Sequence, residues 1–188
     1  MAAGKPCPAL ALWHGNLRGN MTARPSFVAA WAAATRIYDA NDSIGKVKQV
    51  IGGKVKHNFE IPENQGGWSN SCAVRMSYVL NYTGHPVPRI ANLTVSGADN
   101  KWYFYRVKDV IAWLTRQWGK PDMIVSYPSI PVQQLANKKG VILFEVQGWN
   151  DAAGHATFWN GLTCSDHCYF NAPDTNYTTT KANFWELP

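Results

Sequence analysis

The sequence predicts an α+β fold in which helices pack on an antiparallel β-sheet. Apolar residues recur at helical spacing in the first two thirds of the chain, whereas the last third contains short apolar or alternating segments typical of strands. Helices that come first and strands that come later indicate segregated elements rather than alternating βαβ units. At 188 residues, the chain is long enough to bury an ordinary core as one domain.

The first predicted helix starts after Ser26, whose hydroxyl is suited to cap it. Its apolar residues share one face: Phe27, Ala30, Trp31, Ala34 and Tyr38. The glycine-punctuated stretch 44–70 is predicted to be a loop. Residues 1–20 show little periodicity, and we expect them to form a flexible N-terminal extension to a domain that spans residues 21–188.

A second helix is predicted to begin at Cys72, with Asn70 or Ser71 as its cap, and to end before Gly84 and Pro86. Its apolar stripe consists of Cys72, Met76, Val79 and Leu80. A third amphipathic helix is predicted over residues 107–118, where Gly119 and Pro121 stop it. The segment between these two helices, residues 87–100, is predicted to be irregular.

The predicted strands cover residues 123–125, 141–146, 155–159, 162–164 and 184–187. Asn160-Gly161 lies between two alternating segments, which is a strong short-range signal for a β-hairpin with a two-residue loop. This hairpin indicates that at least part of the sheet is antiparallel.

Composition and net charge argue against some classes of function but leave others open. The chain carries a formal net charge of +6 but no run of Lys and Arg, so the basic stripe expected of a nucleic-acid-binding protein is missing. Another anionic polymer, such as the bacterial cell wall, is equally compatible with this charge. The nine Trp and eight Tyr fit a sugar-binding surface, although aromatic residues are more often part of a core.

No segment approaches the length of a transmembrane helix, so we expect no membrane insertion. The only apolar run near the N-terminus, residues 9–13, is too short for the core of a signal peptide. The chain is therefore expected to be cytoplasmic or to be exported without a cleaved leader.

Cys72 and His155 form the outline of a cysteine nucleophile and its base. The start of a helix lowers the pKa of a thiol because of the helix dipole, and the backbone N–H of Cys72 could help to hold an oxyanion there. The alternative is that Cys72 is simply a small core residue. The remaining histidines have no comparable setting and are read as surface or loop residues: His14, His57, His85 and His167.

The predicted hairpin supplies a third candidate, Asp166. If Asn160-Gly161 is a two-residue loop, then Trp159 pairs with Leu162 and His155 lies opposite Asp166. Directly opposed residues have Cβ atoms about 4.5–5.5 Å apart. Asp166 could therefore orient the imidazole, although Asp is also common in turns.

Cys164 and Cys168 allow two interpretations. In a turn their Cα atoms can come within disulfide range, whereas in a continuous strand they would lie about 13 Å apart. A disulfide therefore requires the strand to break near Asp166 and an oxidising environment. The competing hypothesis is a zinc ion held by Cys164, His167 and Cys168, which lacks a second ligand pair at standard spacing.

These residues resemble the type VI secretion amidase effectors of family four, which are compact relatives of the papain-like NlpC/P60 cysteine peptidases. The resemblance covers about residues 21–188. It rests on RPSF at residues 24–27 with Trp31, SCAVRMSYVLN at 71–81, VSGADNK at 95–101, GHATFWNG at 154–161 and CSDHC at 164–168.

The resemblance implies a toxin that the type VI secretion machinery delivers into the periplasm of a rival bacterium. There it would cut the amide between γ-D-glutamate and meso-diaminopimelate in peptidoglycan stem peptides, without a cofactor or metal. The nucleophile, base and orienting acid of the family fall on Cys72, His155 and Asp166, and its disulfide falls on Cys164 and Cys168. A cognate immunity protein is implied as a partner that covers the active-site cleft.

Trp68, Ser71, Ser96, Asp99 and Asn100 are candidates for the substrate groove. For the segment 96–101 a purely structural turn is an equal alternative, because Gly and Asp-Asn clusters mark turns. Two other functions also remain open. One is a cysteine amidase that acts on a different amide, and the other is a non-catalytic module that binds the cell wall through aromatic residues.

Overall fold

The computed structural model describes residues 22–126, 132–149, 152–171 and 175–188. The predicted extension, residues 1–20, lies outside this part of the chain. The described elements follow in the order α1 (Phe27–Ile37), α2 (Ser43–Ile51), α3 (Gly53–Glu60), η1 (Glu63–Gln65), α4 (Cys72–Tyr82), β1 (Thr94–Ser96), β2 (Trp102–Phe104), α5 (Val107–Trp118), β3 (Met123–Ser126), η2 (Val132–Leu135), β4 (Gly140–Gln147), β5 (Gly154–Trp159) and β6 (Thr178–Glu186).

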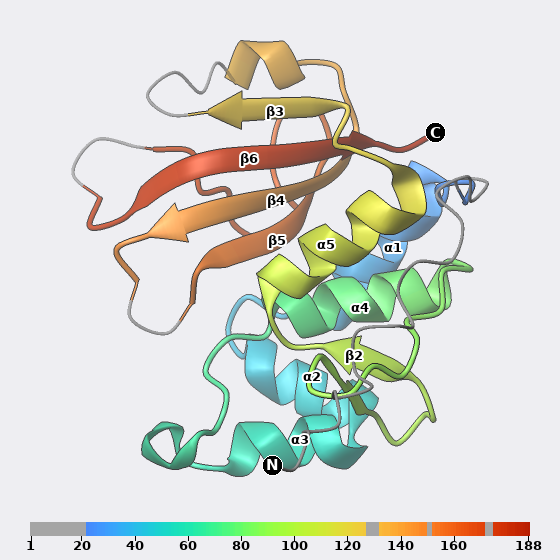
Figure 1. The fold of residues 1–188 in the computed structure, drawn as a ribbon, viewed down its shortest axis with the longest axis vertical. Helices are drawn as coiled ribbons and strands as arrows, with labels where there is room; N and C mark the ends of the chain where they lie inside the picture. Colours follow the sequence, from blue (N-terminus) through green and yellow to red (C-terminus); the bar gives the residue numbers. More distant parts are fainter. Residues whose placement is uncertain (1–21, 127–131, 150–151, 172–174) are drawn as a thin grey trace, which may run out of the picture.

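A four-stranded antiparallel sheet in the order β3-β6-β4-β5 forms one layer of the fold. Figure 1 shows α4 and α5 beside this sheet, with α2, α3 and the small β1–β2 hairpin on the far side of α4. The helix that carries Cys72 is thus packed on an antiparallel sheet. This confirms the predicted α+β class with a papain-like arrangement.

Helix α4 lies at the centre of the molecule. Nine of its eleven residues are buried, so it is enclosed on nearly all sides rather than along a single stripe. It contacts α1, α5, β2 and β5. A helix in this position is held rigidly, which matters for the thiol at its first residue.

Strand β4 is buried on both faces, which explains its nearly continuous apolar sequence. Val141 and Leu143 belong to the core shared with the helices, whereas Ile142 and Phe144 belong to a second apolar cluster on the opposite face of the sheet. The predicted last strand is confirmed but is longer than expected. As β6, it lies between β3 and β4 and reaches back to Thr178.

Two of the helix predictions are confirmed in detail. Ser26 occupies the N-cap of α1 and accepts a hydrogen bond from the N–H of Ala29, at 3.3 Å. Helix α5 has the predicted bounds. Both helices carry clear local signals at their ends, and local signals are what sequence patterns report best.

The predicted loop over residues 44–70 is wrong, because α2 and α3 occupy most of it. Asp42 caps α2 by accepting a hydrogen bond from the N–H of Gly45, at 2.7 Å. Gly52 and Gly53 both have positive φ angles, 62° and 60°, so they form a sharp turn between two short helices. Of the five glycines in this stretch, only Gly52 and Gly53 mark this turn, whereas Gly45 lies within α2, and Gly66 and Gly67 follow η1. Residues 87–100 are also less irregular than predicted, because β1 pairs with β2.

The predicted two-residue hairpin loop is also wrong. Trp159 pairs with Cys164 rather than with Leu162, and residues 160–163 form the loop. Asn160 stabilises this longer loop, since its Oδ1 accepts hydrogen bonds from the N–H groups of Leu162 and Thr163, at 2.9 and 2.8 Å. The register is therefore shifted by two residues, and the segment 162–164 is not a strand.

Cys164 and Cys168 form a disulfide, with their Cα atoms 5.4 Å apart. The chain leaves the hairpin after Cys164, which is the break that this disulfide requires. The zinc alternative is wrong, because both sulfur atoms are bonded to each other and are not available as thiolate ligands. Among the described helices, none combines the length and the apolar character that crossing a membrane would require.

The Cys164–Cys168 disulfide should add measurably to stability. In the chain-entropy account, closing a loop this short stabilises the folded state by about 2 kcal/mol. We therefore expect the double variant Cys164→Ser/Cys168→Ser to lower the free energy of unfolding by about this amount, as measured by urea denaturation. An unchanged midpoint and slope would contradict the expectation. Wild-type protein unfolded with and without reductant provides the control.

Candidate active site

Cys72 is the first residue of α4, and it is 2% exposed. Ser71 occupies the N-cap position but makes no capping hydrogen bond; its Oγ lies 2.9 Å from Oγ of Ser43 instead. Asn70 takes over the capping role, since its Oδ1 accepts a hydrogen bond from the N–H of Cys72, at 3.1 Å. The N–H that was expected to help hold an oxyanion is therefore already engaged.

His155 reaches Cys72 from the sheet. It is the second residue of β5, pairs in register with Phe144 of β4, and is 5% exposed. Its ring lies close enough to the Cys72 thiol for each group to shift the pKa of the other, and the thiol donates to the carbonyl oxygen of Gly154, the residue before His155, at 3.9 Å. Its Nε2 lies 3.2 Å from Oδ1 and 3.1 Å from Oδ2 of Asp166, so the other ring nitrogen, Nδ1, is left for the thiol.

Asp166 lies in the turn closed by the Cys164–Cys168 disulfide, where its side chain is 2% exposed. The structure brings it against His155, as the sequence predicted, but through a different register. Thr157 is the residue that the observed register places nearest to Asp166, and its hydroxyl donates to Oδ1. His155 is therefore a diagonal neighbour of Asp166 rather than its direct partner.

Arg75 completes the surroundings of Asp166. Its Nη2 lies 2.7 Å from Oδ2 of Asp166, and its side chain is 12% exposed. The guanidinium also lies over the ring of Tyr38, 4.8 Å from its centroid. Sequence patterns missed Arg75, although its position one turn after Cys72 places the two side chains on one face of α4.

The three candidate groups shift one another's pKa values. Burial would raise the pKa of the Asp166 carboxyl, but the hydrogen bond and charge of His155 and the charge of Arg75 hold it well below its usual range. Burial opposes a charged imidazole, yet the contacts of His155 with Asp166 and Cys72 raise its pKa to about 9. Asp166 is thus an anion that favours the imidazolium form of His155.

The thiol of Cys72 is biased towards the thiolate. Burial alone would raise its pKa, but the hydrogen bond and charge of His155 and the charge of Arg75 outweigh burial and lower it. A lowered thiol pKa beside a raised imidazole pKa favours a thiolate–imidazolium pair. Such a pair is ready both for attack on a carbonyl carbon and for protonation of a leaving amine.

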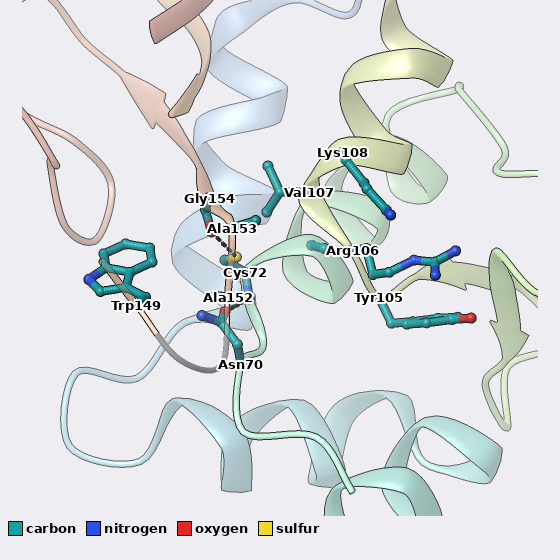
Figure 2. Close-up of a pocket in the computed structure, with 11 residues that line it drawn as sticks. Asn70, Cys72, Tyr105, Arg106, Val107, Lys108, Trp149, Ala152, Ala153 and Gly154 are labelled. Atoms are coloured by element: carbon teal, nitrogen blue, oxygen red, sulfur yellow. Dashed lines mark hydrogen bonds between the residues drawn. The ribbon is translucent and has the colours of Figure 1, made fainter. Parts of the chain in front are cut away.

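Two clefts are lined by this pair of residues, the first by Cys72 and the second by His155. The first has a volume of about 400 Å³ and contains Cys72. Figure 2 shows Trp149 on one side of Cys72 and Tyr105, Arg106 and Lys108 on the other. The second cleft, about 380 Å³, is lined by His155, His167 and Tyr169 among others. Asn70 lines both clefts.

The predicted groove residues divide into two groups. Ser71 lines the second cleft, and Trp68 lies behind the first, where its ring stacks on Tyr105 with centroids 5.0 Å apart. Ser96, Asp99 and Asn100 belong to the β1–β2 hairpin and line neither cleft. Asp99 accepts hydrogen bonds from the hydroxyls of Tyr82 and Tyr103, which supports the alternative of a structural turn.

The other histidines differ from one another. His57 and His167 are exposed as expected, but His167 lines the second cleft, with its Nε2 3.3 Å from the Tyr38 hydroxyl. His85 lies in the loop after α4, which agrees with the loop alternative of its assignment, but it is buried, packs edge-on against Trp118 and has a pKa lowered by burial. His14 lies outside the described residues. Within the part of the chain that the structure describes, no group of three His, Cys, Asp or Glu side chains could hold a metal ion.

Known proteins provide an independent comparison. Residues 68–185 match the family model described as Tae4, type VI secretion system amidase effector protein 4. None of the curated proteins compared with the chain matches it.

Solved structures with the same fold include Tae4 proteins from two organisms. Tae4 in the Tae4–Tai4 effector–immunity complex from Enterobacter cloacae is 44% identical, with a TM-score of 0.76 over 88% of this chain and 99% of that one. Tae4 from the same organism without Tai4 is 43% identical, with a TM-score of 0.76 over 90% and 100%. Tae4 from Salmonella typhimurium, bound to the immunity protein Tai4 from E. cloacae, is 43% identical, with a TM-score of 0.74 over 88% and 100%. The family match spans most of the chain and includes Cys72, His155 and Asp166, so the chain belongs to the family of type VI secretion system amidase effectors 4.

Proposed function

We propose that this chain is a cysteine amidase that hydrolyses the γ-D-glutamyl–meso-diaminopimelate bond in peptidoglycan stem peptides. The observation that carries the proposal is the chain of contacts from Cys72 through His155 to Asp166. A thiol, an imidazole and a buried carboxylate in this order supply the nucleophile, the acid–base group and the group that orients it.

In this mechanism the Cys72 thiolate attacks the amide carbonyl carbon, and the C=O electron pair moves to oxygen as the S–C bond forms. When that pair returns, the C–N bond breaks and the leaving amine takes the proton of the His155 imidazolium. A water molecule that His155 deprotonates then hydrolyses the thioester. This step releases the carboxylic acid and restores the thiolate–imidazolium pair, while Asp166 holds the imidazole in place.

The first cleft supports an acidic peptide as the substrate. Arg106 and Lys108 line it, whereas none of the described residues that line it is acidic. Arg106 is held in place by Asp109, with Nε 2.6 Å from Oδ2, and Lys108 is exposed. Stem peptides that contain D-glutamate and diaminopimelate carry free carboxylates, which complement these cations.

We further propose that the protein is delivered by the type VI machinery into the periplasm of a rival cell and that an immunity protein controls it in the producer. The solved Tae4 complexes with Tai4 support such a partner. The net charge of +6 suggests that the partner is acidic, because opposite potentials speed association. The simplest inhibitory contact covers the clefts around Cys72 and His155.

The first prediction concerns the catalytic groups. We expect Cys72→Ala and His155→Ala to abolish the release of muropeptides from purified sacculi, measured by mass spectrometry. Asp166→Ala should retain more activity, because removal of an orienting acid costs about 10⁴-fold against about 10⁶-fold for the nucleophile or base. The exposed His57 on α3 gives a matched control, His57→Ala, which should keep wild-type turnover.

The identity of the released fragments separates the proposed function from its alternatives. Cleavage at a different amide would point to a cysteine amidase with another substrate. Binding to sacculi without any release by the wild type would point to a wall-binding module. Full turnover by Cys72→Ala would contradict the assigned nucleophile.

The second prediction concerns pH. The active form needs the Cys72 thiolate together with the protonated His155, so kcat/KM should fall above pH about 9 as the imidazolium loses its proton. Asp166 raises the pKa of His155, so Asp166→Asn should move this upper limb to lower pH. The pH dependence of kcat/KM for the two proteins checks both statements. An upper limb that stays in place in Asp166→Asn would exclude His155 as the group that titrates.

The third prediction concerns the immunity partner. A protein that covers the first cleft should protect Cys72 from alkylation by iodoacetamide in a saturated complex, with no chemical modification of the thiol. The rate of labelling, followed by intact-mass analysis with and without the partner, provides the measurement. Undiminished labelling in a complex that has no amidase activity would indicate inhibition at a distance from Cys72.

A further inference from the structure

Asn70 is placed to act on the reacting carbonyl group, a role that no feature of its sequence indicates. We propose that the side-chain amide nitrogen of Asn70 donates the hydrogen bond that stabilises the oxyanion formed when Cys72 attacks an amide. This inference rests on the amidase function proposed above and adds a fourth group to its mechanism.

The orientation of the Asn70 amide follows from its contact with α4. The N–H of Cys72 can only donate, so the Asn70 atom that faces it at 3.1 Å has to be the oxygen, Oδ1. The nitrogen, Nδ2, therefore points away from the helix. Figure 2 shows Asn70 directly beside Cys72, with its amide nitrogen turned away from the backbone of Cys72.

Asn70 Nδ2 is free to serve a ligand. Among the described residues, no hydrogen-bond acceptor pairs with it, whereas Oδ1 is engaged. Asn70 is half-buried and lines both clefts, including the first cleft, which it shares with Cys72. A donor that is held beside the nucleophile and lacks a partner is the arrangement expected of an oxyanion site.

The site needs a side-chain donor for the oxyanion because the backbone N–H of Cys72 is already hydrogen-bonded. During attack, the C=O electron pair moves to oxygen as the S–C bond forms, and the negative charge requires a hydrogen bond in place of water. The N–H of Cys72 would be the usual candidate at a helix start, but it is bonded to Asn70 Oδ1. That bond holds Oδ1 against the helix start, so the side-chain amide is oriented before substrate binds.

The backbone around Asn70 is also held firmly. Ser71, the next residue, is buried and its hydroxyl is 2.9 Å from that of Ser43 on α2. On the other side, the N–H of Trp68 donates to the carbonyl of Asn58 on α3, at 3.0 Å. These contacts tie the segment before α4 to α2 and α3, which limits the reorganisation that the donor would need during the reaction.

The test compares two variants on sacculi and uses alkylation of Cys72 as a second readout. Asn70→Asp keeps the acceptor for the Cys72 N–H but removes the donor, so kcat should fall by about 10³-fold. Asn70→Ala removes both and frees the Cys72 N–H to take over in part, so kcat should fall by about 10²-fold. In Asn70→Ala, KM and the rate of iodoacetamide labelling should stay within about twofold of wild type, because alkylation develops no oxyanion.

Asn58→Ala is the matched control. Asn58 donates through its side chain to the carbonyl of Lys54 within α3 and lines neither cleft, so this variant should keep wild-type kcat. Wild-type kcat in Asn70→Ala would overturn the inference and assign the oxyanion to the Cys72 N–H. Equal losses of hydrolysis and labelling in Asn70→Ala would also overturn it, because Asn70 would then act on the thiol. No cleavage of sacculi by the wild type would instead refute the proposed function.

Discussion

The buried charge of Asp166 is the constraint on which the rest of the site depends. A carboxylate that is withdrawn from water is strongly unfavourable unless it is paired and hydrogen-bonded. Here the side chain is only 2% exposed, and it is met by Arg75 at 2.7 Å, by His155 at 3.1 Å and by the hydroxyl of Thr157. Together these partners offset the cost of burial and stabilise the ionised form of Asp166.

Three separate elements surround the Asp166 carboxylate: helix α4, strand β5 and the turn closed by the disulfide. Helix α4 carries Cys72 and, one turn later, Arg75. Strand β5 carries His155 and Thr157, which are two residues apart and therefore on one face of the sheet. The turn closed by the disulfide supplies Asp166, and the chain that follows it covers the second apolar cluster of the sheet through Tyr169 and other aromatic residues. The geometry of the candidate site and the packing of the core thus depend on the same elements.

The charged groups of the site interact one with the next, from the buried Asp166 to Cys72 at the cleft. Arg75 and His155 stabilise the Asp166 anion, which favours the imidazolium of His155 and, through it, the thiolate of Cys72. Cys72 and His155 therefore form the end of a buried network that lines the two clefts, Cys72 in the first and His155 in the second. The burial of α4 on nearly all sides keeps that end in place.

The sequence by itself determined the elements whose signals are local. The caps and the apolar periodicity predicted α1, α4 and α5, and the position of Cys72 at a helix start together with His155 on a strand indicated a cysteine nucleophile and its base. The order of helices before strands predicted the α+β class, and the family motifs implied its papain-like arrangement. These features could be predicted because helix ends and buried faces depend on residues that are close together in the chain.

Only the tertiary structure decided how distant segments pair. Asp166 reaches His155 across a loop two residues longer than predicted, because the side chain of Asn160 stabilises that loop, and sequence alone does not report such a bond. The central place of β6 and the contact of Arg75 with Asp166 likewise depend on residues that are far apart in the chain. Periodicity shows which side of an element is buried, but the partner on that side is selected by packing across the whole fold.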